Sequence, residues 1–203
     1  MSFLKKIGLF FSFVFHPVFI PLFVIFIDYN EFLNPVNQQK LVLQIVLVSI
    51  VLPLLFLIYL KKTKQIDTLS LFNSNERKAP LLFQIVLFTV FLFFHYSDHQ
   101  TFKLVLFFEG ATLTLIAALV FVIFQIKASL HVASLSSLLF FAIGLYYANA
   151  LQNGTLIVIL LFFVFVVGLS RWILKAHTVK EIVIGFCIGA LPQLLLFSSN
   201  YKI

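Results

Sequence analysis

Long apolar runs constrain this chain more than any other feature of its sequence. A helix needs about 18 or more apolar residues to cross a bilayer core of roughly 30 Å. Backbone groups cannot stay unpaired in hydrocarbon, so helices are the expected form. We therefore expect an all-α polytopic transmembrane bundle that forms a single integral membrane domain over residues 1–203. Three of the runs are close to the short limit, so the bundle would have six or seven spans. The runs lie at about 8–27, 41–60, 80–95, 102–126, 131–148, 155–171 and 179–197.

Composition excludes the soluble classes of protein. Hydrophobic residues make up 62% of the chain and charged residues 10%, whereas a soluble domain carries about 25% charged residues. The lone Cys187 excludes disulfides and cysteine metal sites. A net charge of +7 would suggest nucleic acid in a soluble protein. Here it favours contact with anionic headgroups, so we expect membrane lipids and no nucleic acid as partners. The sequence neither requires nor excludes a protein partner.

The basic residues are distributed unevenly between alternate loops. If all seven runs cross, only Lys40, Lys103 and Lys202 fall on one face, and the other eleven of the fourteen Lys and Arg fall on the opposite face. The positive-inside rule then places the N-terminus inside. No small-residue cleavage site follows the first apolar run, so we interpret it as a retained span. His16-Pro17 and Pro21 should kink it or make part of it re-entrant.

Three polar clusters adjoin these runs, and the loop parity places all three on one face. Ionisable residues cost several kcal/mol at membrane depth, so those at span ends are functional candidates. In a chain with so few polar residues, the shared face suggests a site. The clusters are Glu76 to Pro80, Lys127 to His131 and Ser170 to Glu181.

The residue types in these clusters suit phosphoryl chemistry. Arg171 presents a planar fork of donors for phosphate oxygens. His177 and His131 allow the nucleophile and the general acid to be separate groups. Glu181 follows His177 by four residues, so on a continuous helix it could orient the imidazole and stabilise its cation. This chemistry needs no metal and no cofactor. Further cations are present at Arg77, Lys78 and Lys127.

The third cluster resembles a signature of the type 2 phosphatidic acid phosphatase family, which reads Ser-Arg, five residues, His, three residues, Asp. Ser170, Arg171 and His177 match in identity and spacing, and Glu181 stands in place of the Asp. The second cluster is similar to the family's Pro-Ser-Gly-His signature. Ser129 and His131 match that signature, whereas Ala128 and Leu130 differ from it.

The remaining signature of that family is Lys, six residues, Arg-Pro, and it is absent as such. Arg77 has Ser70 where the Lys should be, and Pro80 comes two residues late. The Glu76 to Pro80 cluster is therefore only a partial analogue, and the resemblance covers roughly the second half of the chain, with a family-like core at about 76–197.

The resemblance implies a role for each candidate residue. His177 would be the nucleophile that forms a phosphohistidine, His131 the acid that protonates the leaving oxygen, and Glu181 the group that orients His177. The family's substrates are phosphatidic acid, phosphatidylglycerol phosphate, lipid A phosphates and isoprenoid diphosphates, which favours the bacterial cytoplasmic membrane as the location. The phosphoryl oxygens would be held by Arg171 and Ser129, with Lys127, Arg77 and Ser170 beside them.

Two alternatives to a lipid phosphatase remain. One is a catalytically silent relative that binds anionic lipid or serves as a membrane subunit of a complex. The other is a small transporter, which we disfavour because no inverted repeat is visible and we place no ionisable residue in the middle of a span. A lone histidine at a span end is usually an interfacial or packing residue, and we interpret His16, His95 and His99 in this way.

Overall fold

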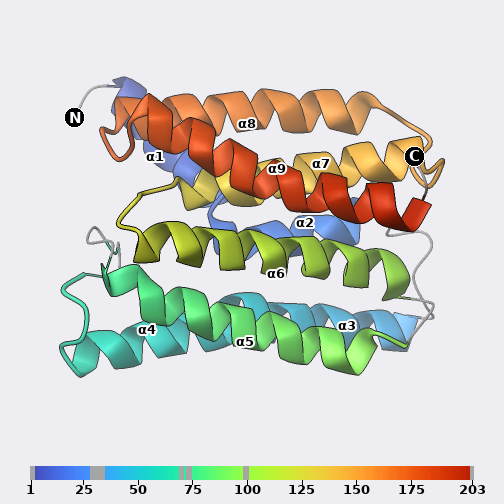
Figure 1. The fold of residues 1–203 in the computed structure, drawn as a ribbon, viewed down its shortest axis with the longest axis horizontal. Helices are drawn as coiled ribbons and strands as arrows, with labels where there is room; N and C mark the ends of the chain where they lie inside the picture. Colours follow the sequence, from blue (N-terminus) through green and yellow to red (C-terminus); the bar gives the residue numbers. More distant parts are fainter. Residues whose placement is uncertain (1–2, 28–34, 69–70, 72–74, 98–100, 202–203) are drawn as a thin grey trace. The chain divides into compact units, whose positions relative to one another are not determined.

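The computed structural model of the chain describes residues 3–27, 35–68, 71, 75–97 and 101–201 (Figure 1). The chain divides into two compact units, each of which is described here by itself. Unit 1 comprises residues 1–20 and 128–203, and unit 2 comprises residues 21–127.

Helices account for all the regular secondary structure of the described residues, which contain no strands. Seven helical segments among them are long and apolar enough to cross a membrane. Each begins and ends within five residues of a predicted run. The expected all-α bundle of apolar helices is therefore confirmed, and these seven segments of the described residues are its candidate spans. They are Phe3–Ile25, Gln38–Lys62, Asn75–His95, Phe102–Ile123, Leu130–Tyr147, Thr155–Ile173 and Val179–Ser199.

The first span is broken where the sequence predicts a kink. Helix α1, Phe3–Val14, ends before a 3-10 turn at Pro17–Phe19, and α2 follows at Ile20–Ile27. A proline ring disfavours helical backbone in the preceding residue, and His16 is extended with φ −64° and ψ 139°. The helical ladder changes register at this point, because the His16 N–H donates to the Phe13 carbonyl at 3.2 Å.

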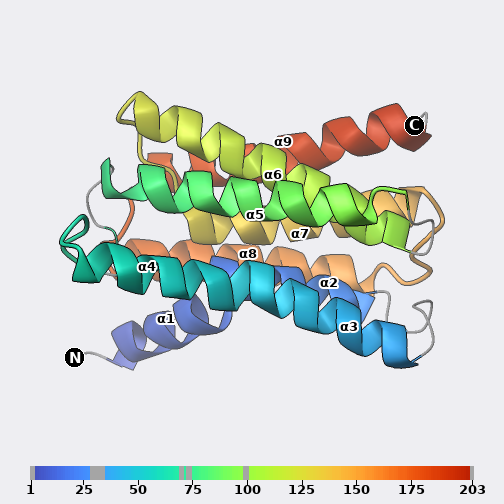
Figure 2. The same cartoon turned by 90° about the horizontal axis from the view of Figure 1, so that it is seen from below.

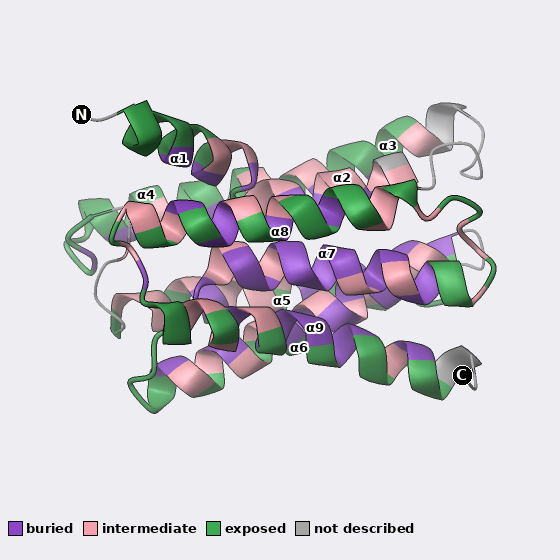
Figure 3. Cartoon of the chain, turned by 90° about the horizontal axis from the view of Figure 1, so that it is seen from above, coloured by how far each residue is buried: buried purple, intermediate pink, exposed green. Residues whose placement is uncertain are grey.

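Unit 1 is built around helix α7, Leu130–Tyr147, which lies between α8, Thr155–Ile173, and α9, Val179–Tyr201 (Figures 1 and 3). Helix α1 packs against α8. Most of α7 is buried, as Figure 3 shows. An apolar helix enclosed by other helices in this way can carry polar groups that lipid would not tolerate.

Two glycines four residues apart let α9 approach α7 closely. A Cβ at Gly185 would lie 2.5 Å from the Ser129 carbonyl oxygen, and one at Gly189 would meet the Ala133 carbonyl oxygen. Small residues at this spacing are the usual device for close helix packing in membranes.

Buried polar contacts reinforce the α7–α9 interface. Ser136 Oγ donates to the Phe186 carbonyl at 3.0 Å, and the Gln193 amide donates to Ser137 Oγ at 3.1 Å. At the end of the interface the Ser129 N–H donates to the Glu181 carbonyl at 3.0 Å. The first turns of α7 and α9 are therefore fixed side by side, at the end of unit 1 where α8 finishes.

Unit 2 contains one long, locally irregular helix. Helix α3, Pro35–Val46, continues through a π-helical turn at Leu47–Val51 into α4, Leu52–Lys62, and Figure 2 shows them as one continuous rod. The Gln84 amide donates to the Val48 carbonyl at 3.0 Å. This bond connects the π-helical turn to the neighbouring helix α5 in the membrane.

The other two long helices of unit 2 are α5, Lys78–His95, and α6, Phe102–Ile123. Phe88 and Phe91 of α5 both pack on Phe108 of α6, with ring centroids 4.8 and 4.3 Å apart. Glu109 lies about a third of the way along α6. Our sequence expectation concerned only the middle of a span, and Glu109 is an ionisable residue inside this helix but to one side of its middle.

Candidate functional site

His177 is positioned by the way helix α8 ends. Lys175 adopts a left-handed backbone with φ 55°. The Ala176 N–H donates to the Arg171 carbonyl at 3.0 Å and the Lys175 N–H to the Trp172 carbonyl at 2.9 Å. These are the two bonds of a Schellman motif, which closes a helix and reverses the chain. His177 follows at once and is buried, with 8% of its surface exposed.

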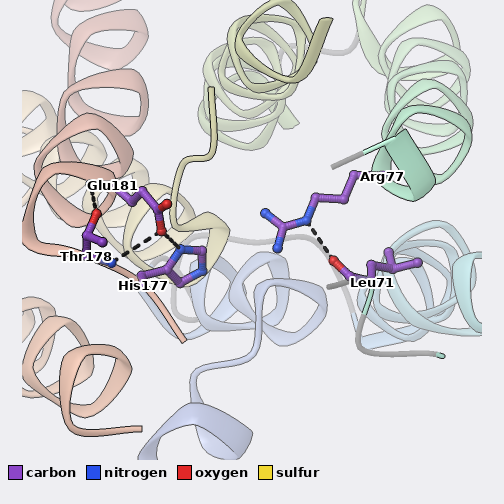
Figure 4. A network of polar contacts seen from close by, with 5 residues as sticks. All are labelled: Leu71, Arg77, His177, Thr178 and Glu181. Atoms are coloured by element: carbon purple, nitrogen blue, oxygen red, sulfur yellow. Dashed lines mark hydrogen bonds and ion pairs between the residues drawn. The ribbon is translucent and has the colours of Figure 1, made fainter. Parts of the chain in front are cut away.

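The predicted pairing of His177 with Glu181 is present. His177 Nδ1 lies 2.8 Å from Glu181 Oε2, and Figure 4 shows the ring and the carboxylate facing one another. A carboxylate oxygen can only accept, so the Nδ1 atom carries the proton of this bond. In the neutral ring the lone pair is then on Nε2, which fixes the tautomer that a nucleophilic histidine requires.

Glu181 has a second, structural role at the start of α9. The Thr178 N–H donates to Glu181 Oε2, and the Glu181 N–H donates to Thr178 Oγ1, both at 3.3 Å (Figure 4). This reciprocal pair is a capping box, which satisfies two backbone donors at a helix N-terminus. The same carboxylate oxygen therefore caps α9 and holds the ring of His177.

His131 lies in the first turn of α7 and is held by the broken first span. Its Nε2–H donates to the Ser12 carbonyl at 3.1 Å. In a regular helix the Ser12 carbonyl would accept the His16 N–H, but that N–H donates to the Phe13 carbonyl instead. The break at Pro17 thus releases the carbonyl that orients His131.

His16, which we interpreted from the sequence as an interfacial or packing residue, lies beside one of the candidate site residues. Its ring centroid lies 5.0 Å from that of His131, and the two rings are nearly perpendicular at 86°. The sequence holds one signal that could have found it, since Ser12 and His16 are polar residues four apart, directly before a proline within an apolar span.

Arg171 supplies positive charge to this end of unit 1. It lies in the last turn of α8, where the exposed carbonyls of a helix favour a cation. The guanidinium of Arg171 interacts electrostatically with both His16 and His131, and His177 also interacts electrostatically with His131. His131 therefore lies within electrostatic range of Arg171, His16 and His177, and His16 lies within range of Arg171.

Two buried serines lie next to His131. Ser129 precedes it by two residues, and Ser12 contacts it through its backbone carbonyl. Ser129 is fully buried at the N-cap of α7, and Ser12 is 6% exposed. Within the described residues neither Oγ has a hydrogen-bond partner, although buried hydroxyls are normally bonded. Ser170, in contrast, donates to the Val166 carbonyl at 2.7 Å. Its hydroxyl satisfies its own helix rather than the site where we expected it.

The remaining predicted phosphate ligands, Arg77 and Lys127, belong to unit 2, so the geometry of unit 1 includes neither of them. Arg77 Nε donates to the Leu71 carbonyl at 2.9 Å (Figure 4), and Lys127 is exposed. His95 Nε2 bonds Gln44 Oε1 at 3.1 Å. Ser70 and His99 lie outside the described residues.

The described residues contain no group of three His, Cys, Asp or Glu side chains that could hold a metal.

Comparison of the chain with models of protein families, with curated proteins and with solved structures found no match. The candidate site must therefore be judged on its own chemistry, which combines an oriented imidazole, a second imidazole, a guanidinium and two buried hydroxyls.

Proposed function

We propose that this membrane protein is a metal-independent phosphatase that hydrolyses a lipid phosphate or an isoprenoid diphosphate through a phosphohistidine. The observation that carries the proposal is the 2.8 Å hydrogen bond between buried His177 and partly buried Glu181. Arg171 and His131 lie within electrostatic range of one another in the same unit, and His177 also acts on His131. Phosphoryl transfer through histidine can use these groups, which are a nucleophile, a carboxylate that orients it, a second imidazole and a guanidinium.

In the first step, His177 Nε2 attacks the phosphorus atom and the bond from phosphorus to the leaving oxygen breaks. The negative charge of the bound substrate favours the imidazolium form of His131. Because the Ser12 carbonyl holds its Nε2–H, His131 then gives the leaving oxygen its Nδ1 proton. Glu181 stabilises the positive charge that develops on the ring of His177. Arg171 neutralises charge on the phosphoryl oxygens.

In the second step, water attacks the phosphorus atom of the phosphohistidine. The Nδ1 atom of His131, now neutral, takes a proton from that water, and the bond from phosphorus to His177 Nε2 breaks to release phosphate. His131 returns to its starting protonation state, so the cycle needs no other acid or base.

The proposal includes a location in the bacterial cytoplasmic membrane with the N-terminus inside. The loop that joins α8 to α9 then lies on the cytoplasmic face, which carries eleven of the fourteen basic residues if all seven spans cross. A substrate would enter from the cytoplasmic leaflet, and the basic loops would attract its anionic headgroup.

A silent lipid-binding relative is the second candidate, and the capping box favours it. Thr178 and Glu181 satisfy each other's backbone donors, so the conformation of Glu181 has a structural explanation that requires no catalysis. In that case the buried hydroxyls and Arg171 would bind an anionic headgroup without turnover.

Phosphate release by the purified protein separates these candidates. The panel is phosphatidic acid, phosphatidylglycerol phosphate and undecaprenyl diphosphate, with His177→Ala as the test variant and His95→Ala as the matched control in unit 2. The proposal expects release that His177→Ala abolishes and His95→Ala preserves. Absence of release from well-folded wild-type protein across the panel would favour the silent relative.

A further inference from the structure

The candidate site contains a third component that none of the sequence signatures includes, namely the broken end of α1. Ser12 and His16 are separated from His131 by more than a hundred residues, yet the Ser12 carbonyl accepts its Nε2–H and the His16 ring lies against it. Ser12 and His16 are therefore polar residues of the first span that lie against His131.

We propose that Ser12 and His16 bind phosphoryl oxygens beside Arg171, so that the proline break in the first span completes the anion-binding part of the site. This inference rests on the proposed function for the identity of the anion. It assigns phosphate contacts to His16, which we first interpreted as an interfacial or packing residue, and to Ser12, which no sequence signature includes.

The hydroxyl of Ser12 supports this assignment. Ser12 is 6% exposed, and its Oγ has no hydrogen-bond partner among the described residues. Its backbone carbonyl is already occupied by His131. An unsatisfied buried hydroxyl destabilises the protein, and a phosphoryl oxygen that accepts its proton would remove this cost.

Ser129 presents a second hydroxyl in the same condition. It is fully buried at the N-cap of α7, where its side chain caps no backbone donor, and its Oγ has no partner within the described part of the chain. The first N–H groups of a helix lack intrahelical partners. An anion at this N-terminus would satisfy both those N–H groups and the hydroxyl.

The tautomer of His16 makes it a hydrogen-bond donor. The Val18 N–H donates to His16 Nδ1 at 3.5 Å, so the proton of the neutral ring is on Nε2. The side chain is exposed, and it is therefore accessible to a ligand that enters from outside the helix bundle. Arg171 lies within electrostatic range of His16, so an anion that binds His16 also feels the positive charge of the guanidinium.

Three variants test the assignment by binding rather than by turnover. His16→Phe keeps an aromatic ring and removes the donor, and His16→Gln replaces the donor with an amide N–H. Ser12→Ala removes only the hydroxyl and leaves the carbonyl that His131 needs, so it tests the proposal even where His16→Phe fails to fold. His95→Phe, in unit 2, is the matched control. The probes are radiolabelled inorganic phosphate and phosphatidic acid in mixed micelles.

We expect His16→Phe and Ser12→Ala each to raise the Kd for inorganic phosphate by about tenfold, because each loses a hydrogen bond to a charged oxygen. The KM for phosphatidic acid should rise in parallel with little change in kcat, and His16→Gln should recover much of the loss. His95→Phe should bind like the wild-type protein.

The outcomes separate this inference from the proposed function. Phosphate binding that depends on His16 and Ser12 in a protein without phosphatase activity would sustain the inference and reject the enzyme. Activity that depends on His177 but not on His16 or Ser12 would sustain the enzyme and overturn the inference. Losses confined to phosphatidic acid would assign the two residues to its glycerol or acyl groups, which also overturns the inference.

Discussion

His131 and Ser12 are 119 positions apart in the sequence, and the imidazole Nε2–H of the first donates to the backbone carbonyl of the second at 3.1 Å. The bond exists because Pro17 interrupts α1. The His16 N–H bonds to the Phe13 carbonyl rather than to that of Ser12. A helix break therefore creates the acceptor that orients the histidine.

Replacement of the proline should undo this arrangement. Pro17→Ala permits α1 to continue, so the His16 N–H returns to the Ser12 carbonyl and His131 loses its partner. We expect a decrease in kcat of about 10- to 100-fold, since small misplacements of catalytic groups cost this much. Pro21→Ala is the control, because Pro21 lies in the first turn of α2, where proline fits. Equal effects of the two substitutions would contradict the role of the break.

Glu181 can be tested separately as a helix cap and as an orienting carboxylate. Glu181→Gln retains the capping box, in which Glu and Gln are equivalent, but removes the charge that stabilises the His177 cation. We expect a wild-type Tm with a decrease in kcat of about 10²-fold or more. Glu181→Ala and Thr178→Ala should each lower stability by about 1 kcal/mol.

The Tm and kcat of these three variants therefore decide between the two roles. A Glu181→Gln protein with wild-type kcat would show that the carboxylate serves only the helix. A lowered kcat at an unchanged Tm would favour the catalytic role.

The close packing of α9 on α7 should be intolerant of a single methyl group at Gly189. A Cβ there would meet the Ala133 carbonyl oxygen and Ser136 Oγ, so Gly189→Ala should destabilise the protein by about 1–3 kcal/mol. Gly8→Ala is the matched control, since its Cβ would lie 3.5 Å or more from its neighbours. Thermal unfolding in detergent measures both variants, and similar Tm values would contradict the packing.

The turn before His177 holds a residue in an unfavourable backbone conformation. Lys175 has φ 55° at a position where glycine is preferred. Lys175→Gly should raise the unfolding free energy by up to about 1 kcal/mol, measured by chemical denaturation in detergent. Lys175→Ala removes the same charge but keeps the Cβ atom, so it should show no gain. A gain in both variants would attribute the effect to charge instead.

Most of the fold could be predicted from the sequence because the bilayer imposes a simple rule on apolar length. The runs at 102–126 and 155–171 differ from the observed spans by only a few residues at their C-terminal ends. The spacing of His177 and Glu181 was also informative, although the pair does not share a helix face: His177 precedes α9, and the capping box at Thr178 turns the Glu181 carboxylate back toward it.

The rest of the site depends on tertiary contacts that one-dimensional spacing does not encode. His16 is far from His131 in the sequence, so only the packing of α1 within unit 1 shows that their rings touch. Ser170 matches the expected motif, yet its hydroxyl donates to Val166, a local bond that serine often makes within helices. A motif specifies residue identity but not the partner of each hydroxyl.

The central claim is that His177 becomes covalently phosphorylated, and rapid-quench trapping tests it most directly. Purified protein is mixed with phosphatidic acid labelled with ³²P in its headgroup, quenched within milliseconds in alkaline detergent, and mapped by proteolysis and mass spectrometry. The account predicts a base-stable, acid-labile phosphate on His177 that is absent from His177→Ala. Substrate turnover without label on His177, or label that persists in His177→Ala, would contradict it.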